Sequence, residues 1–350
     1  MERMVDFTRS GFDHDPYSLG LMQGRYFRRQ IKELYEIFRG FAKKQAKAKL
    51  GFFGGLLGDL PLTYFLSRGE KFEPFIDQDF RLEMQGLAEG ARVDYRFIRI
   101  LNVLDDVVNL SLCSAIGVRD LATSSYVYAA NLDYPIFLET MRNNVFVMRK
   151  GNFITVGFPG YIGVLRGVNR CGLFLASLTS KTKKASNRFG IPNGLLYRKV
   201  INSALSVDEG LRLIESSTRR GASNNVLLGT RDEALLVEFN KDHVCEIGRR
   251  CNAVAVTNHF RSPLLTSYQE MVKPNFEIEV RYEHTGKDFS ERRLRCLGSL
   301  DVSNLKEAFT NQEPLLNDGT VFTTLVDFSK NELIVVIPHR KEELIVPLTW

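Results

Sequence analysis

The sequence predicts an α+β fold in which antiparallel sheets are covered by helices. Three observations support this class. The first third of the chain has the apolar spacing of helices, short β-like runs begin at residue 113, and two groups of helical segments interrupt those runs. This order of helices, strands, helices and strands is typical of antiparallel sheets that pack against helical layers.

The first third of the chain is predicted to be helical. Residues 17–50 place four apolar side chains at helical spacing between charged residues: Leu34, Ile37, Phe38 and Phe41. Pro74 and Asp77 then mark a loop. Two further helices are predicted over residues 79–91 and 95–110.

The remaining chain is predicted to alternate between strands and helices. Runs rich in β-branched and aromatic residues, bounded by turn formers, predict strands at 113–118, 124–135, 143–150, 152–160, 161–168 and 172–180. Helices are predicted at 193–205 and 207–217, and strands return at 224–230, 233–240 and 252–259. Two more helices, 290–300 and 302–309, precede the last predicted strands, 320–328, 332–338 and 343–348.

The composition indicates a globular protein and argues against several other classes. With 350 residues, 44% of them hydrophobic, the chain can bury a sizeable core. Its five cysteines lack CxxC spacing, which argues against a zinc site or a disulfide framework and favours a reducing, cytoplasmic compartment. The charged N-terminus lacks a signal-peptide core. The net charge of +6 is modest, so no nucleic-acid partner is expected, and no cofactor is predicted.

Cys113 and Asp133 are predicted to face each other across a hairpin. The turn-rich residues 119–125 join two β-like segments, and symmetric pairing about them places Val118 opposite Tyr128 and Cys113 opposite Asp133. A carboxylate buried there needs a cation. The α-amino group of a newly exposed N-terminal cysteine would be one, and its pKa of roughly 7.7–8.0 suits it as a base for its own thiol. On spacing alone, a structural buried cysteine is the commoner alternative.

Several motifs together resemble a known family. These are "CSAIGV…AANLDYP", "FPGYIGVLRGVNRCGLFLASL", "ASNNVLLG…LLVEFN", "VTNHF", "SERRLRCL" and "TVFTTLVDF…ELIVVIP". In order and spacing they resemble the group of acid ceramidases, N-acylethanolamine acid amidases and acyl-coenzyme A:isopenicillin N acyltransferases. This group belongs to the N-terminal nucleophile (Ntn) hydrolases and is related to bile-salt hydrolases. The resemblance extends from Tyr17 to the C-terminus.

The resemblance implies both a fold and a reaction. The fold would be an αββα sandwich of two antiparallel sheets between helical layers. The chain would cut itself at Leu112–Cys113, leaving a helical light chain, 1–112, and a catalytic heavy chain, 113–350. The Cys113 thiolate would then cleave a linear amide, an N-acyl amine with a lipid-like acyl group, through a thioester that water or another amine resolves.

The resemblance also implies roles for other residues. Asp133 would orient the new amino group, Asn225 or its neighbour Asn224 would bind the oxyanion through a side-chain N–H, and Arg293 would support the nucleophile region. Without the resemblance, the Asn pair is ordinary turn chemistry and "ERRLR" is a solvated helix face. His259 recurs in the family motif and is expected to be structural.

Two departures from the family pattern leave the substrate class and self-cleavage open. Ceramidases and bile-salt hydrolases carry an arginine, which helps to hold charge near the thiol, where this sequence has Ala130. Ceramidases carry an asparagine where Thr179 stands. These two residues and Tyr134 are candidate residues of the substrate pocket. The alternative is an altered family member that acts as a binding or scaffold protein.

Residues 43–66 form a candidate membrane-surface segment. Four lysines join a Gly-rich apolar stretch that is too short and broken to span a bilayer: Phe52, Phe53, Leu56, Leu57, Leu60, Leu62, Tyr64, Phe65 and Leu66. This stretch can lie in the interface, with its lysines on anionic head groups. A helical hairpin packed on the sheets, or a lid over the acyl pocket, is the other reading. A lipid-surface protein without a catalytic thiol is therefore a further alternative function.

Overall fold

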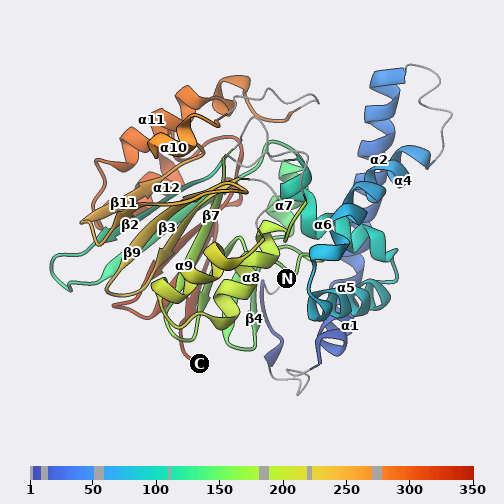
Figure 1. The fold of residues 1–350 in the computed structure, drawn as a ribbon, viewed down its shortest axis with the longest axis horizontal. Coiled ribbons are helices and arrows are strands. Elements are labelled where there is room, and N and C mark those ends of the chain that lie inside the picture. Colours follow the sequence, from blue (N-terminus) through green and yellow to red (C-terminus); the bar gives the residue numbers. More distant parts are fainter. Residues whose placement is uncertain are drawn as a thin grey trace.

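The computed structural model describes residues 3–8, 15–50, 59–108, 112–180, 189–218, 223–269 and 278–350. Two sheets lie face to face between helical layers, and a group of N-terminal helices stands beside them (Figure 1). The predicted α+β sandwich is confirmed. Strand pairs are antiparallel in both sheets, except that β1 joins β4 in parallel.

The eight-stranded sheet has the order β1 (Met4–Asp6), β4 (Phe146–Lys150), β5 (Phe153–Gly157), β6 (Arg166–Asn169), β7 (Phe174–Thr179), β8 (Asn224–Gly229), β9 (Ala234–Phe239) and β10 (Val244–Arg249). The six-stranded sheet has the order β11 (Ala253–Val256), β2 (Ser114–Arg119), β3 (Tyr126–Asp133), β12 (Thr320–Asp327), β13 (Glu332–Ile337) and β14 (Glu342–Pro347). The short β1 and the half-exposed β10 are edge strands that the sequence pattern did not predict, because neither has a clear apolar alternation.

Helices cover both outer faces of the sandwich (Figure 1). The six-stranded sheet is covered by α11 (Lys287–Leu297) and α12 (Leu305–Asn311). The short helix α10 (Pro263–Thr266) follows β11 in the chain. The eight-stranded sheet is covered by α8 (Asn193–Ser203) and α9 (Val207–Ser216), which share one apolar core with the N-terminal helices α1 (Pro16–Tyr26), α2 (Arg28–Leu50), α4 (Leu60–Ser67), α5 (Gln78–Ala91) and α6 (Tyr95–Val108). Shorter elements are η2 (Arg68–Phe75), α7 (Leu138–Asn143), η4 (Tyr282–Thr285) and η5 (Pro338–Arg340).

Helices α1 and α5 approach so closely that only glycine fits at their contact. A Cβ on Gly20 would lie 1.9 Å from the carbonyl oxygen of Glu83, and one on Gly86 would lie 2.0 Å from that of Tyr17. Both obstacles are backbone atoms, so side-chain rotation cannot relieve the clash. The glycines therefore fix the distance between the two helices.

A buried cluster of charged side chains links the N-terminal helices to the sandwich. Glu83 of α5 accepts hydrogen bonds from Arg198 of α8 at 2.9 Å and from Gln23 of α1 at 2.8 Å. The Lys150 ammonium on β4 lies 3.9 Å from the same carboxylate. Burial lowers the pKa of Lys150 to about 7, and the Glu83 charge opposes that shift. The cluster thus joins residues on the two sides of the Leu112–Cys113 bond.

The structure corrects part of the predicted membrane-surface segment. Leu62 and Leu66 are 3% and 2% exposed and belong to the apolar core, so the prediction that they form an outer apolar surface is wrong. They point inward because α4 packs on the neighbouring helices with one face. Leu60 and Tyr64 on the same helix are exposed.

Phe65 is partly buried against the same apolar core, whereas Phe52, Phe53, Leu56 and Leu57 lie outside the described residues. Contact with a membrane surface therefore stays a prediction. Across the described helices, none combines the length and the apolar character that a bilayer crossing requires.

Candidate active site

The hairpin that carries Cys113 and Asp133 is present, but its predicted register is wrong by one residue. Val118 pairs with Val127, not with Tyr128, and the backbone N–H of Leu112 donates to the carbonyl of Asp133 at 3.0 Å. In the connecting loop, the backbone N–H of Asp120 donates to the carbonyl oxygen of Ser125 at 2.8 Å. The loop is therefore not centred on the residue about which symmetric pairing was predicted. Because a one-residue slip moves a side chain to the other face, Cys113 points between the sheets while Asp133 points toward the outer helices.

Arg293 of α11 nevertheless brings Asp133 to the Leu112–Cys113 peptide. Its buried guanidinium donates through Nη1 to the carbonyl oxygens of Leu112 and Cys113, the second at 2.7 Å. The same nitrogen lies 3.5 Å from Oδ2 of Asp133. It also donates a hydrogen bond to Oγ of Ser114 at 3.0 Å. The predicted residues Leu112, Cys113, Asp133 and Arg293 are therefore together in space.

Asp133 has one occupied and one open carboxylate oxygen. Oδ2 accepts a hydrogen bond from Nδ2 of Asn317 at 3.1 Å, whereas Oδ1 is buried with no hydrogen-bond partner among the described residues. Burial raises the pKa of Asp133 to about 6, and the charge of Arg293 opposes that rise. A buried acceptor of this kind, close to the Leu112–Cys113 bond, suits an ammonium group.

The Cys113 thiol is completely buried and is not part of a disulfide. Burial raises its pKa, and the guanidinium of Arg166 on β6 is the largest effect in the opposite direction. Arg166 is not among the predicted site residues. The signal in the sequence was a single charge inside the apolar run "YIGVLRGV", where a strand that is buried on both faces offers no solvent.

The two candidate oxyanion residues lie on opposite faces of β8. Asn225 points between the sheets, as Leu227 and Cys113 do, whereas Asn224 points toward the helices. Both amide hydrogens of Asn225 are engaged, since Nδ2 donates to the carbonyls of Thr257 at 2.9 Å and His259 at 3.0 Å. Asn225 is therefore on the face of the thiol, and its oxyanion role stays a prediction.

The 257–259 loop contains the polar residues of "VTNHF". His259 shares its Nδ1 with Oγ1 of Thr257 at 3.1 Å and Oγ of Ser290 at 2.8 Å. Burial lowers the pKa of His259 to about 4, so the ring is neutral near pH 7. Asn258, which was not predicted, accepts from Arg293 at 3.0 Å and donates to the carbonyl of Thr179 at 2.9 Å. This loop therefore positions Arg293.

An apolar cavity of about 80 Å³ lies where the N-terminal helices meet the sandwich. Leu34, Phe38, Leu101 and Leu104 of α2 and α6 form one wall, and residues from 134–165 form the other. Tyr134 lines it and donates its hydroxyl hydrogen to Asp105 of α6. Burial raises the pKa of Asp105 to about 7, while Arg166 opposes the shift. Of the predicted pocket residues, Tyr134 lines this cavity, whereas Ala130 and Thr179 do not.

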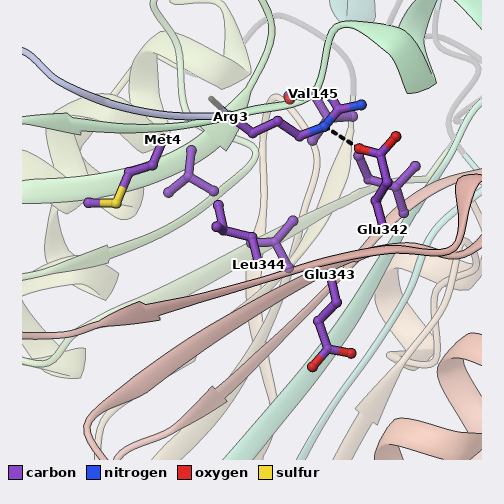
Figure 2. Close-up of a pocket in the computed structure, with 9 residues that line it drawn as sticks. Arg3, Met4, Val145, Glu342, Glu343 and Leu344 are labelled. Atoms are coloured by element: carbon purple, nitrogen blue, oxygen red, sulfur yellow. Dashed lines mark hydrogen bonds and ion pairs between the residues drawn. The ribbon is translucent and has the colours of Figure 1, made fainter. Parts of the chain in front are cut away.

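A second hollow lies at the open edge of the sandwich, between β1 and β4 on one side and β13 and β14 on the other. Figure 2 shows its lining, which is largely aliphatic with the Arg3–Glu342 ion pair at 2.5 Å on its wall. Its volume is about 490 Å³. None of the predicted site residues lines it, so the candidate site is the region around Cys113.

Comparisons with known proteins give a match to one family model and matches to several relatives. The family model described as acyl-coenzyme A:6-aminopenicillanic acid acyl-transferase matches residues 121–332. The chain is 25% identical to protein dcd1A of Dictyostelium discoideum, over 92% of this chain and 76% of that protein. It is 23% identical to acid ceramidase of Mus musculus, over 79% of this chain and 71% of that protein. A solved Caenorhabditis elegans N-acylethanolamine-hydrolyzing acid amidase ortholog matches with a TM-score of 0.41 and 17% identity, covering 67% of this chain and 100% of that one.

Proposed function

The chain belongs to the acyl-coenzyme A:6-aminopenicillanic acid acyl-transferase family, and from that premise we propose that it is a self-processing Ntn amidase or acyltransferase with Cys113 as nucleophile. The observation that carries the proposal is the arrangement around one peptide bond. The guanidinium of Arg293 donates a hydrogen bond to the Leu112 carbonyl oxygen, and the Asp133 carboxylate forms an ion pair with the same guanidinium. A carbonyl held in this way is polarised toward attack.

Self-cleavage would proceed as an acyl shift followed by hydrolysis. The Cys113 sulfur attacks the carbonyl carbon of Leu112, and Arg293 stabilises the oxyanion. The C–N bond then breaks, the thiol proton passes to the departing nitrogen, and a thioester remains. Water adds to the thioester and releases the Leu112 carboxylate and the Cys113 thiol. The products are the 1–112 light chain and the 113–350 heavy chain.

The new terminus would then act on a foreign amide. Its ammonium group faces the open Oδ1 of Asp133, which holds it in place. As a neutral amine it takes the proton of its own thiol, and the thiolate attacks the substrate carbonyl. Asn225 is the proposed oxyanion donor, because it points to the same space as Cys113. To donate to the oxyanion, the side-chain amide of Asn225 must give up one of the two hydrogen bonds that it donates to carbonyls of the 257–259 loop.

We assign the acyl group of the substrate to the apolar cavity beside Tyr134. Its walls are largely leucine and phenylalanine side chains, which suit an aliphatic chain better than a polar one. Helices α2 and α6, which form one wall, precede Leu112 in the chain. Cleavage after Leu112 would therefore remove the covalent link between this wall and the sandwich. An N-acyl amine with an apolar acyl chain is therefore the proposed substrate.

Mass spectrometry of the purified protein tests the proposal. The wild type is expected to give a fragment that begins at Cys113, and Cys113→Ala is expected to stay intact. A panel of N-acyl amides of increasing acyl length, with Cys113→Ala as control, then identifies substrate turnover. An intact wild type whose Cys113 also resists a thiol-directed electrophile under native conditions would favour the binding or scaffold alternative.

A further inference from the structure

We propose that Arg166 is a catalytic residue that stabilises the thiolate of Cys113 directly across the space between the two sheets. This inference rests on the proposed function and deepens it. The cation that stabilises the nucleophile lies on β6, and this strand is not part of the hairpin that carries Cys113.

The geometry of Arg166 is fixed by three carbonyl oxygens. Nη1 donates to Leu165 at 2.7 Å and to Ser177 at 2.6 Å, both in or beside its own sheet. Nη2 crosses to the other sheet and donates to Asn131 at 2.8 Å. Asn131 is paired with Ser114, the residue after Cys113. The guanidinium is thus anchored within one residue of the nucleophile.

Among the described residues, no carboxylate forms an ion pair with Arg166. The side chain is 0% exposed, its hydrogen bonds go to neutral carbonyls, and its Nε has no hydrogen-bond partner within the described chain. A buried guanidinium without a counter-ion is strongly unfavourable. Arg198, another arginine buried in the eight-stranded half, has Glu83 for this purpose. A thiolate at Cys113 would be the missing anion.

The surroundings of the thiol make such a cation necessary. Burial and the charge of Asp133 both raise the thiol pKa, and Arg166 acts against them. Arg293 also faces Cys113, but its charge is already shared with Asp133 and the peptide carbonyls. Asp105 and Asp133 feel the charge of Arg166 as well. The raised pKa of Asp105, about 7, leaves much of it uncharged near neutrality, and Asp133 already lies 3.5 Å from Arg293. Arg166 is therefore the cation that can serve the thiolate.

The step at which Arg166 acts is balanced within the proposed mechanism. The proton leaves the Cys113 sulfur for the α-amino nitrogen, which gives a thiolate and an ammonium. Arg166 holds the thiolate as an ion pair until sulfur attacks the acyl carbon and the carbon–nitrogen bond of the substrate breaks. The ammonium proton then goes to the leaving amine.

The thiol pKa provides the direct test. In protein labelled with 13Cβ-cysteine, the Cys113 signal is assigned by its loss in Cys113→Ala and is titrated in the wild type, Arg166→Gln and Arg166→Lys. Arg166→Gln is expected to raise the thiol pKa by about one unit or more, because a nearby opposite charge has gone. Arg166→Lys keeps the charge and is expected to stay closer to the wild type. The pH–rate profile of amide cleavage should shift by the same amount.

A matched control separates this role from folding. Arg198→Gln makes the same change at another buried arginine and is expected to lower thermal stability without moving the thiol pKa. If Arg166→Gln also lowers thermal stability without moving the thiol pKa, Arg166 is structural and the inference fails. The inference also fails if Arg166→Gln and Arg166→Lys shift the thiol pKa equally. If the wild type neither cuts itself nor cleaves amides, the proposed function fails and Arg166 is not catalytic, even where the pKa shift shows that it stabilises the thiolate.

A measurement on the unmodified residue covers the case in which Arg166→Gln does not fold. The 15Nε signal of Arg166 in the wild type is expected to move with pH at the thiol pKa of Cys113. The same signal is expected to stay still over that range in Cys113→Ala. A signal that is insensitive to Cys113 in the wild type would overturn the inference.

Discussion

The guanidinium of Arg293 donates a hydrogen bond to the carbonyl oxygen of Leu112, a residue 181 positions away in the sequence. This contact joins the helical layer over the six-stranded sheet to the peptide bond before Cys113. It also places the positive charge where negative charge develops when that carbonyl is attacked.

We therefore expect Arg293→Gln to slow self-cleavage by about 10²–10³-fold, the usual effect of losing one oxyanion donor. The rate is measured from the appearance of the Cys113 fragment on denaturing gels. Arg292→Gln is the matched control, because its guanidinium lies over the ring of Phe289 at 5.2 Å on the exposed side of the same helix. Equal rates in the wild type and Arg293→Gln would contradict the proposed oxyanion contact.

Asp105 should make the uncut protein less stable as the pH rises. Burial raises its pKa from 3.8 to about 7, so the folded state binds this proton more tightly than the unfolded state. The resulting stabilisation is complete below the unfolded pKa and is lost as the pH rises through the folded one. The loss amounts to at most about 4 kcal/mol, at 1.36 kcal/mol for each pKa unit.

Asp105→Asn is expected to remove most of this dependence between pH 4 and pH 7, in urea unfolding monitored by tryptophan and tyrosine fluorescence. Asp133 has a smaller rise, to about 6, and should leave a weaker slope in the same direction. The exposed Asp232→Asn is the control and should keep the wild-type slope. A slope in Asp105→Asn as steep as in the wild type would show that Asp105 is not buried in its acid form.

Glu83→Gln should destabilise the chain by about 3–5 kcal/mol, because it leaves Arg198 and Lys150 buried without their carboxylate. The free energy of unfolding in urea measures the effect. The exposed Asp59→Asn, which breaks a surface pair with Arg39, should change it little.

The same cluster should keep the two fragments together after cleavage. We expect fragments 1–112 and 113–350 of the cleaved wild type to elute as one species from a sizing column. Glu83→Gln should release part of the smaller fragment. Complete co-elution in Glu83→Gln would mean that apolar contacts alone hold the fragments.

Gly20→Ala should lower stability by about 1–3 kcal/mol, the usual cost of overpacking, because its Cβ would meet the backbone of Glu83. Gly40→Ala is the control, since a Cβ there meets nothing within 4 Å on the exposed side of α2. That change should stabilise the helix by about 0.5–1 kcal/mol. Thermal unfolding of both variants checks the opposite signs, and two changes of the same sign would argue against the close α1–α5 contact.

Local sequence pattern was sufficient for most of the fold. Strand β12 and the first residues of β3 are rich in β-branched and aromatic side chains, and α5 and α6 show helical apolar spacing, so short-range preferences define them. The hairpin between β2 and β3 needed only a turn-rich linker. That hairpin brings Cys113 to the region of Asp133, so the spacing of residues along the chain is enough to indicate where the candidate nucleophile lies.

Register and contacts between layers were settled only by tertiary structure. A turn-rich linker does not specify its own closure, so Cys113 and Asp133 took opposite faces and meet through Arg293. Arg166 reaches the same space from the other sheet. Such contacts depend on which distant strands stack and which side chains share one volume. The spacing of residues along a single segment cannot predict these contacts, because the burial of a side chain depends on how all the layers pack together.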